Sequence, residues 1–267
     1  MTDLVSQFRW LEDQRADEHD LLGDIFCVSF FHLLDPAEVL SRFEPVSPAE
    51  TTTFKELCGR ARASFEDAAD VLYVGVAQVG EWSVAVEPWG GQAVLSTMMT
   101  RLSRSGEVVS VARNDYAGHR FVYAVDGTVV TSFNPAEPDR RWGSDPDRLS
   151  GLMREVGMDL GPPEGEWGVE SWCGRPNQEP VARAFALAAK ITGVALTFTA
   201  ANGLHFVGAA RKHERSTKRG RDGQRAMSRE KSAEIRQWAK DHGLPLSERG
   251  RVASAVVEKA EDPRDTP

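Results

Sequence analysis

The chain has 267 residues, of which 41% are hydrophobic and 27% charged, enough for one large domain or two smaller ones. No stretch approaches the roughly 18 apolar residues of a membrane-spanning helix, and the polar, acidic start of the chain does not resemble a signal peptide. Cys27, Cys58 and Cys173 are too widely spaced for a disulfide framework, so we expect a cytoplasmic protein that makes no membrane contact.

Charge is distributed unevenly along the chain. The formal net charge is −8, yet residues 211–267 hold 15 Lys and Arg against 10 Asp and Glu, whereas residues 1–210 hold 17 against 30. An acidic body therefore carries a basic C-terminal part. Such asymmetry indicates that the basic part contacts nucleic acid, with the acidic body held away from the phosphates.

Residues 1–210 alternate strand and helix patterns. The expected strands are 25–34, 72–78, 82–87, 108–112, 121–125, 128–133, 194–199 and 204–207. Turn residues predict hairpins at 72–87, at Asp126-Gly127 and at Asn202-Gly203. Helices are expected after the Asp35-Pro36 cap, at 93–102, at 147–156 and from Pro180 to Gly193. The pattern predicts an α+β body, a mainly antiparallel sheet with helices on one face.

Two clusters of polar and aromatic residues stand out in this body. One is Glu81-Trp82 with Glu87-Pro-Trp-Gly-Gly91, and the other lies within 133–146 and includes Asp139, Arg140, Arg141, Trp142 and Asp145. Tryptophan beside Gly and Pro either lines a binding groove or seals the edge of a sheet. These stretches, with Phe121-Val-Tyr123, resemble an actinobacterial domain family of unknown function over roughly residues 20–160, which implies no activity.

Motifs for catalysis or metal binding are absent from the sequence. There is no Gly-rich phosphate loop, no paired-cysteine site, no His-Glu-x-x-His and no Gly-x-Ser-x-Gly elbow. His32 and His205 lie in strand-like runs typical of structural histidines. We therefore expect no enzyme, no cofactor and no metal; a deep pocket with convergent acids and His119 would argue otherwise.

Residues 211–227 form a basic segment that connects the body to the C-terminal part. They contain no aliphatic Val, Ile or Leu and no aromatic residue, and they hold seven Lys and Arg against two acids. Such a segment cannot bury enough apolar surface to fold, so we expect a flexible, disordered linker. Its cations, Arg219 and Arg221 among them, either follow the phosphate backbone of DNA or form a solvated hinge.

Residues 228–262 predict two short helices joined by a tight turn. Ser228 caps the first helix, Trp238 lies on its apolar face, and Gly243 with Pro245 ends it. The turn reads Ser247-Glu-Arg-Gly-Arg251. It presents two guanidinium groups with no bulky side chain between them, a shape that suits the narrow minor groove of A·T-rich DNA. The alternative is a helical hairpin that binds a protein.

The run from Glu234 to Glu258 closely resembles the C-terminal DNA-binding domain of the Lsr-type nucleoid-associated silencers of actinobacteria, counterparts of the H-NS proteins. In that family the Arg-Gly-Arg turn enters the minor groove, which implies this role for Arg249, Gly250 and Arg251. Val252-Ala253 replaces the Ile-Pro of many members, and the family's N-terminal oligomerisation domain is not recognisable. The remaining DNA-binding candidates are Ser247, Glu248, Lys231, Arg236 and Lys240.

These observations predict a nucleoid protein that binds double-stranded A·T-rich DNA and silences or organises chromosomal or foreign DNA. Because one small module binds weakly, we expect the body to supply self-association or to bind a protein partner. The alternative is a protein-interaction or sensor module, in stress or phage defence, that its tail merely tethers to DNA.

Overall fold

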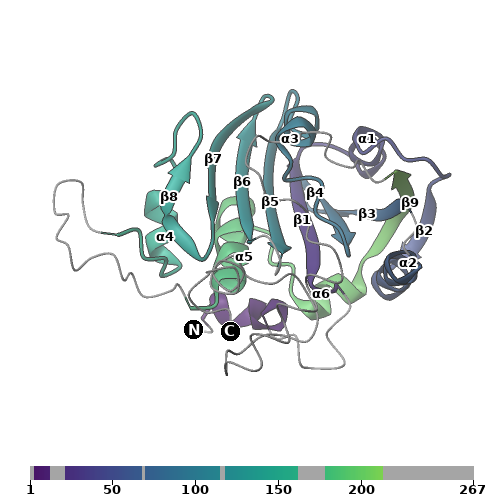
Figure 1. Ribbon diagram of the computed structural model, residues 1–267, viewed down its shortest axis with the longest axis horizontal. Coiled ribbons are helices and arrows are strands. Elements are labelled where there is room, and N and C mark those ends of the chain that lie inside the picture. The colour runs from purple at the N-terminus through teal and green to yellow at the C-terminus, as the bar shows by residue number, and fades with distance from the viewer. Residues whose placement is uncertain (1–2, 13–21, 68–69, 115–117, 162–177, 213–267) are drawn as a thin grey trace, which may run out of the picture. The chain divides into compact units, whose positions relative to one another are not determined.

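The computed structural model describes residues 3–12, 22–67, 70–114, 118–161 and 178–212 (Figure 1). The chain divides into two compact units, residues 1–214 and 215–267, and every described residue belongs to the first. The expected two-helix domain and nearly all of the expected linker lie outside the described residues. The first two linker residues, Arg211 and Lys212, are instead the end of a strand.

A nine-stranded sheet in the order β2-β9-β3-β4-β1-β5-β6-β7-β8 is the framework of this unit (Figure 1). All neighbouring strands are antiparallel, which confirms the predicted mainly antiparallel sheet. The strands are β1 (Ile25–His32), β2 (Glu50–Thr53), β3 (Val71–Val79), β4 (Trp82–Pro88), β5 (Glu107–Asn114), β6 (Arg120–Val125), β7 (Thr128–Asn134), β8 (Glu137–Trp142) and β9 (His205–Lys212).

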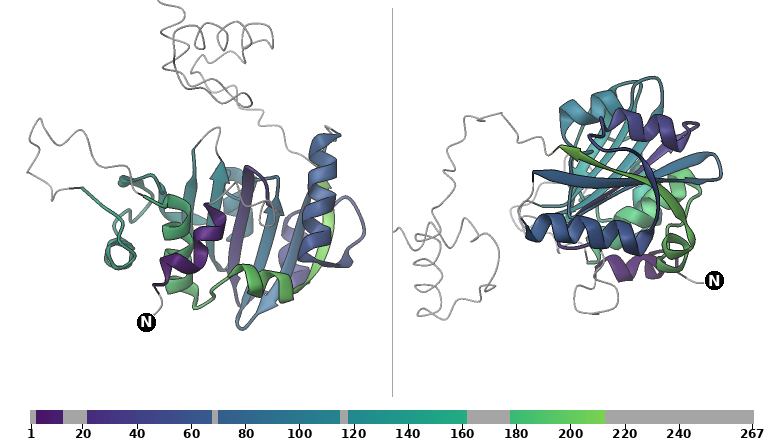
Figure 2. Two further views of the ribbon diagram at one scale, coloured as in Figure 1. Left: turned by 90° about the horizontal axis from the view of Figure 1, so that it is seen from below. Right: turned by 90° about the vertical axis from the view of Figure 1, so that its right-hand side faces the viewer.

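Helices cover both faces of the sheet, so the expectation of helices on one face is wrong (Figure 2). The reason lies in the strands themselves. In β1, Phe26, Val28 and Phe30 enter one core, while Cys27 and Phe31 enter the other. A strand that is apolar on both sides requires cover on both sides.

The first face carries most of the helices. The 3-10 helix η1 (Val5–Leu11) and α2 (Phe54–Glu66), α4 (Ser150–Glu155), α5 (Pro180–Thr192) and α6 (Phe198–Gly203) all contribute to its core. The second face is covered by α1 (Pro36–Arg42) and α3 (Ser96–Leu102). No helix among the described residues is long and apolar enough to cross a bilayer.

Local sequence signals account for the helix ends. The Asp35 side chain accepts from the N–H groups of Ala37 and Glu38, as the sequence predicts for the start of α1. A reciprocal capping box between Thr53 and Glu56 starts α2. At the end of α5, Gly193 adopts a left-handed φ of 71°, which confirms the predicted boundary.

Two of the three predicted hairpins are confirmed. The turn between β6 and β7 places Asp126 and Gly127 at φ 49° and 78°, both in the left-handed region that a type I′ turn requires. The hairpin expected around Asn202-Gly203 is wrong, because these residues close α6, which Thr197 caps. Strand β9 pairs instead with β2 and β3.

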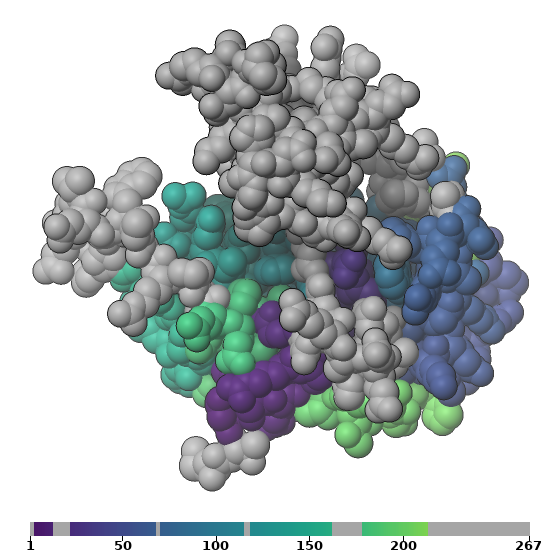
Figure 3. Space-filling view, turned by 60° about the horizontal axis from the view of Figure 1, so that its bottom comes forward, coloured from purple at the N-terminus to yellow at the C-terminus, as the bar shows by residue number. Residues whose placement is uncertain are grey.

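Helix η1 packs against the start of α5 (Figure 3). The Glu12 carboxylate accepts from the backbone N–H groups of Val181 and Ala182, at 2.5 and 2.9 Å. Arg9 forms an ion pair with Glu179. Because the first N–H groups of a helix have no partner within it, Glu12 caps α5 from a distant part of the chain.

Candidate functional site

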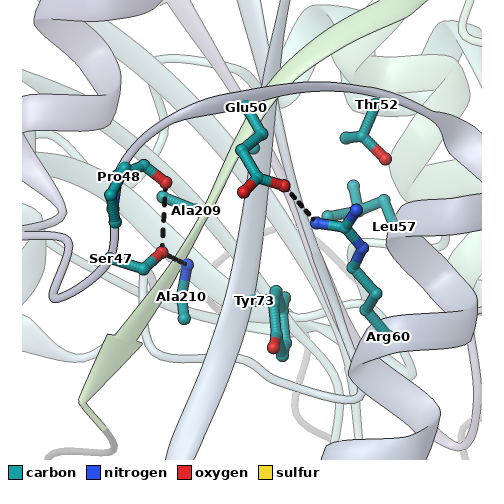
Figure 4. Close-up of a pocket in the computed structure, with 10 residues that line it drawn as sticks. Ser47, Pro48, Glu50, Thr52, Leu57, Arg60, Tyr73, Ala209 and Ala210 are labelled. Atoms are coloured by element: carbon teal, nitrogen blue, oxygen red, sulfur yellow. Dashed lines mark hydrogen bonds and ion pairs between the residues drawn. The ribbon is translucent and has the colours of Figure 1, made fainter.

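A pocket of about 170 Å³ lies between α2 and the β2–β9–β3 edge of the sheet (Figure 4). Its floor is made of the small residues Gly208, Ala209 and Ala210 of β9. Glu50, Gly208 and Gly75 stand opposite one another on the three strands, and a Cβ at Gly208 would come within 2.9 Å of Thr52 Cγ2. The side chains of Thr52 and Leu57 fill the space above these glycines, so the glycines let β2 and α2 pack closely on β9 and β3.

The residues before β2 hold the outer wall of the pocket. The N–H of Val46 donates to the carbonyl of Ala210 at 2.8 Å, and the Ser47 hydroxyl accepts from the N–H of Ala210 at 2.9 Å. Ser47 also donates to the carbonyl of Pro48 at 3.2 Å. These bonds fix the loop against β9, so this wall is held to the edge of the sheet.

Charged and aromatic side chains converge over this floor (Figure 4). Arg60 of α2 and Glu50 of β2 form an ion pair of 2.9 Å at the rim, with side chains 49% and 60% exposed. Tyr73 of β3 supplies a phenol to the lining. The pocket thus combines one anionic group, one cationic group and one aromatic ring. These residues were not predicted from the sequence, although the capping pair Thr53 and Glu56 marks the start of α2.

The Glu87–Gly91 cluster forms the interior of the protein. Glu87 Oε1 and Oε2 accept from the N–H groups of Ala93 and Gln92, at 3.0 and 3.3 Å, and Oε2 lies 3.9 Å from Nη1 of Arg211. Burial raises the pKa of Glu87, while the N–H of Ala93 and the Arg211 charge act in the opposite direction. Trp89 packs on Phe65, with ring centroids 4.8 Å apart.

The second cluster seals the edge of the sheet. Its residues 137–142 form the edge strand β8, where the Arg120 guanidinium stacks over Trp142 at 4.8 Å. Arg141 forms an ion pair of 2.7 Å with Asp147. Charged side chains on an edge strand discourage pairing with another chain.

His32 and His119 have structural surroundings. His32 stacks on Trp82 at 4.6 Å and lies 3.4 Å from Glu107, which also accepts from the Tyr123 hydroxyl. His119 accepts from the N–H of Asn114 at 3.2 Å, and burial lowers its pKa to about 4, helped by the charge of Arg113. His119 does not line the pocket under α2. The described residues contain no cluster of His, Cys, Asp and Glu that could hold a metal.

Both parts of the chain match models of known protein families. Residues 1–213 match the model of a family of unknown function, DUF6461. The chain belongs to the DUF6461 family. Residues 227–260 match the Lsr2 DNA-binding domain, which confirms the resemblance seen in the sequence and supports DNA binding. No curated protein and no solved structure matches the chain.

The DNA-binding candidates belong to the part of the chain that follows the DUF6461 body. Eight of them fall within the Lsr2 match, and the other two lie in the basic segment before it. All ten lie outside the described residues: Arg219, Arg221, Lys231, Arg236, Lys240, Ser247, Glu248, Arg249, Gly250 and Arg251.

Proposed function

We propose that this protein is a non-enzymatic nucleoid component that binds the minor groove of A·T-rich double-stranded DNA through Arg249, Gly250 and Arg251. In this role it silences or organises chromosomal or foreign DNA. The observation that carries the proposal is the match of residues 227–260 to the Lsr2 DNA-binding domain, which includes this turn. The basic charge of residues 211–267 agrees with it.

The chemistry of the turn supports a preference for A·T-rich DNA. The minor groove of such DNA is narrow and strongly negative, so it favours guanidinium groups over bulkier side chains. Gly250 lacks a Cβ, which lets the backbone approach the groove floor between Arg249 and Arg251. Minor-groove readout separates A·T from G·C pairs but little else. The protein therefore prefers tracts of A·T-rich sequence over a unique operator.

Contacts around the turn set affinity more than specificity. Lys231, Arg236 and Lys240 are proposed to contact the flanking phosphates, and Arg219 and Arg221 those further along the duplex. Ser247 bonds a phosphate or caps the turn. Glu248 opposes phosphate binding because of its charge.

One small module with two inserted arginines binds weakly, so occupancy of chromosomal DNA requires several linked copies. We propose that the DUF6461 body supplies them, by self-association or through a protein partner. Light scattering of the full chain with and without DNA tests the self-association. Dimers or larger species at micromolar concentration support it, and a strict monomer in both conditions contradicts it.

Binding to poly(dA·dT) and poly(dG·dC) duplexes tests the readout. The full chain is expected to prefer poly(dA·dT), and the double variant Arg249→Ala, Arg251→Ala to lose that preference. The matched control is Arg229→Ala, Arg264→Ala, which removes the same charge from the same unit and should keep the preference. Equal binding of both duplexes by the unaltered chain would refute the proposal.

A further inference from the structure

The pocket under α2 has no part in the proposed DNA contacts. We propose that it binds a small dipolar molecule that carries an ammonium and a carboxylate on neighbouring atoms, such as a free amino acid with a short side chain. The pocket lies wholly within residues 47–73 and 208–210 of the body. Ligand binding in this pocket is therefore tested independently of the DNA-binding turn.

The size of the pocket limits the ligand. The space open to the centres of water molecules is about 170 Å³, so the pocket can hold several of them. The pocket is partly open to solvent, so a nucleotide or a peptide would extend out of it. A molecule of roughly six to nine non-hydrogen atoms fits it.

The rim selects for charge of both signs. Glu50 and Arg60 lie side by side, joined by the bond between Oε2 and Nη1. A ligand that is only anionic is attracted by Arg60 and repelled by Glu50, and one that is only cationic meets the reverse. A dipolar ligand can place its ammonium near Glu50 and its carboxylate near Arg60, where charge-assisted hydrogen bonds are strongest.

The interior of the pocket suits a short, partly apolar side chain. Leu57, Ala209 and Ala210 contribute apolar surface to the lining. The Tyr73 hydroxyl makes no hydrogen bond to any described residue, so it can bond a ligand without breaking a contact of the fold. Ser47, whose hydroxyl already holds the loop to β9, shapes the wall instead.

Isothermal titration of the full chain with amino acids and their singly charged analogues tests the proposal. We expect L-alanine, L-serine or L-valine to bind with a Kd of about 0.1–1 mM, the range open to so small a ligand. Propionate and isopropylamine, which carry one charge each, should bind at least about tenfold more weakly. L-Tryptophan should bind more weakly because its side chain extends beyond the pocket.

Variants locate the binding in this pocket. Arg60→Gln and Glu50→Gln should each weaken binding by about tenfold or more, and Tyr73→Phe by a few-fold. The matched control is Arg62→Gln, on the same helix, whose exposed ion pair with Glu66 lies outside the pocket lining. Both ion pairs are exposed, so none of the substitutions at them should alter the fold. Thermal unfolding of each variant checks this.

Each outcome of these titrations either supports or overturns the proposal. Binding of a short dipolar amino acid that is lost in Arg60→Gln and kept in Arg62→Gln supports the proposal. Absence of binding by all three amino acids at 10-fold the expected Kd, equal binding of the singly charged analogues, or unchanged binding in Arg60→Gln overturns it. Duplex preference is measured separately, so an altered result there concerns only the DNA-binding turn.

Discussion

Glu87 and Arg211 face each other inside the protein, with Oε2 and Nη1 3.9 Å apart and both side chains 2% exposed. Arg211 also donates through Nε to the carbonyl of Phe43 at 3.2 Å. The pair joins the end of β4 to the end of β9, the last described strand before the Lsr2 domain match. A buried charge is costly once its counter-charge is removed.

Replacing Glu87 with Gln is therefore expected to destabilise the body by about 3 kcal/mol, because the shape stays while the charge that balances Arg211 is lost. Urea unfolding of the full chain measures this. The exposed pair of Arg62 and Glu66 provides the comparison, and Arg62→Gln should cost less than about 1 kcal/mol. Equal effects of the two variants would contradict the assignment.

Gly23 makes room for Trp89. Gly23 has a φ of 79°, and a Cβ there would lie 2.4 Å from the Trp89 ring. Gly23→Ala should destabilise the protein by about 2–4 kcal/mol, from overpacking together with the left-handed backbone. Gly80 is a matched control, since its φ is 60° but no atom lies within 4 Å of the added Cβ. Gly80→Ala should cost only about 1 kcal/mol in thermal unfolding.

Glu12 supplies the cap that the start of α5 lacks. Its Oε1 accepts both N–H groups, so Glu12→Gln keeps an acceptor whereas Glu12→Ala removes it. We expect Glu12→Ala to cost about 1–2 kcal/mol and Glu12→Gln clearly less. Chemical unfolding at pH 7 compares them, and an equal loss in both variants would show that the bonds to α5 contribute little.

His119 makes the stability of the body depend on pH. Its pKa in the folded protein is lowered to about 4, from 6.5, by burial and by Arg113. Between these values the unfolded chain binds the proton and the folded protein does not. This contribution to stability is therefore complete above pH 6.5 and is lost as the pH falls toward 4. His119→Asn, which keeps an acceptor for the N–H of Asn114, should flatten the dependence of unfolding free energy on pH in this window. An unaltered slope would contradict this assignment.

The proposed phosphate contacts of the basic segment predict a change in salt dependence. Each contact contributes about 0.9 to the slope of log binding constant against log salt. Replacing Arg219 and Arg221 with Gln should lower the magnitude of the slope by up to about 1.8, with the preference for A·T-rich DNA retained. Fluorescence anisotropy over a salt series measures it. An unchanged slope would identify the segment as a solvated hinge.

Turn and cap residues made much of the fold predictable. Asp126-Gly127 marks a real hairpin, and Asp35, Pro180 and Gly193 mark real helix ends, because their conformations are set by neighbours in sequence. The same logic failed at Asn202-Gly203. Asn and Gly also end helices, and the Thr197 cap with the alanines that follow it decides for α6.

Long-range relationships were not predictable from one sequence. The pairing of β9 with β2 and β3 depends on contacts across more than 130 residues, and the pocket under α2 exists only once these strands meet. The presence of helices on both faces did leave a signal in the sequence. Both the odd-numbered and the even-numbered residues of β1 are mostly apolar, so both faces of the strand need to be covered. The Arg-Gly-Arg turn was identified from its own residues and then supported by the family resemblance, and its geometry remains a prediction.

Among the described strands, β9 is the last to be synthesised, yet it lies between β2 and β3 and is the only neighbour of β2. We therefore expect β3 to expose an unpaired edge during translation until residues 205–212 have left the ribosome. A chain interrupted before that point presents an adhesive edge to other nascent chains. Because the Lsr2 match begins only at residue 227, any polypeptide long enough to include it also contains the strand that closes the sheet.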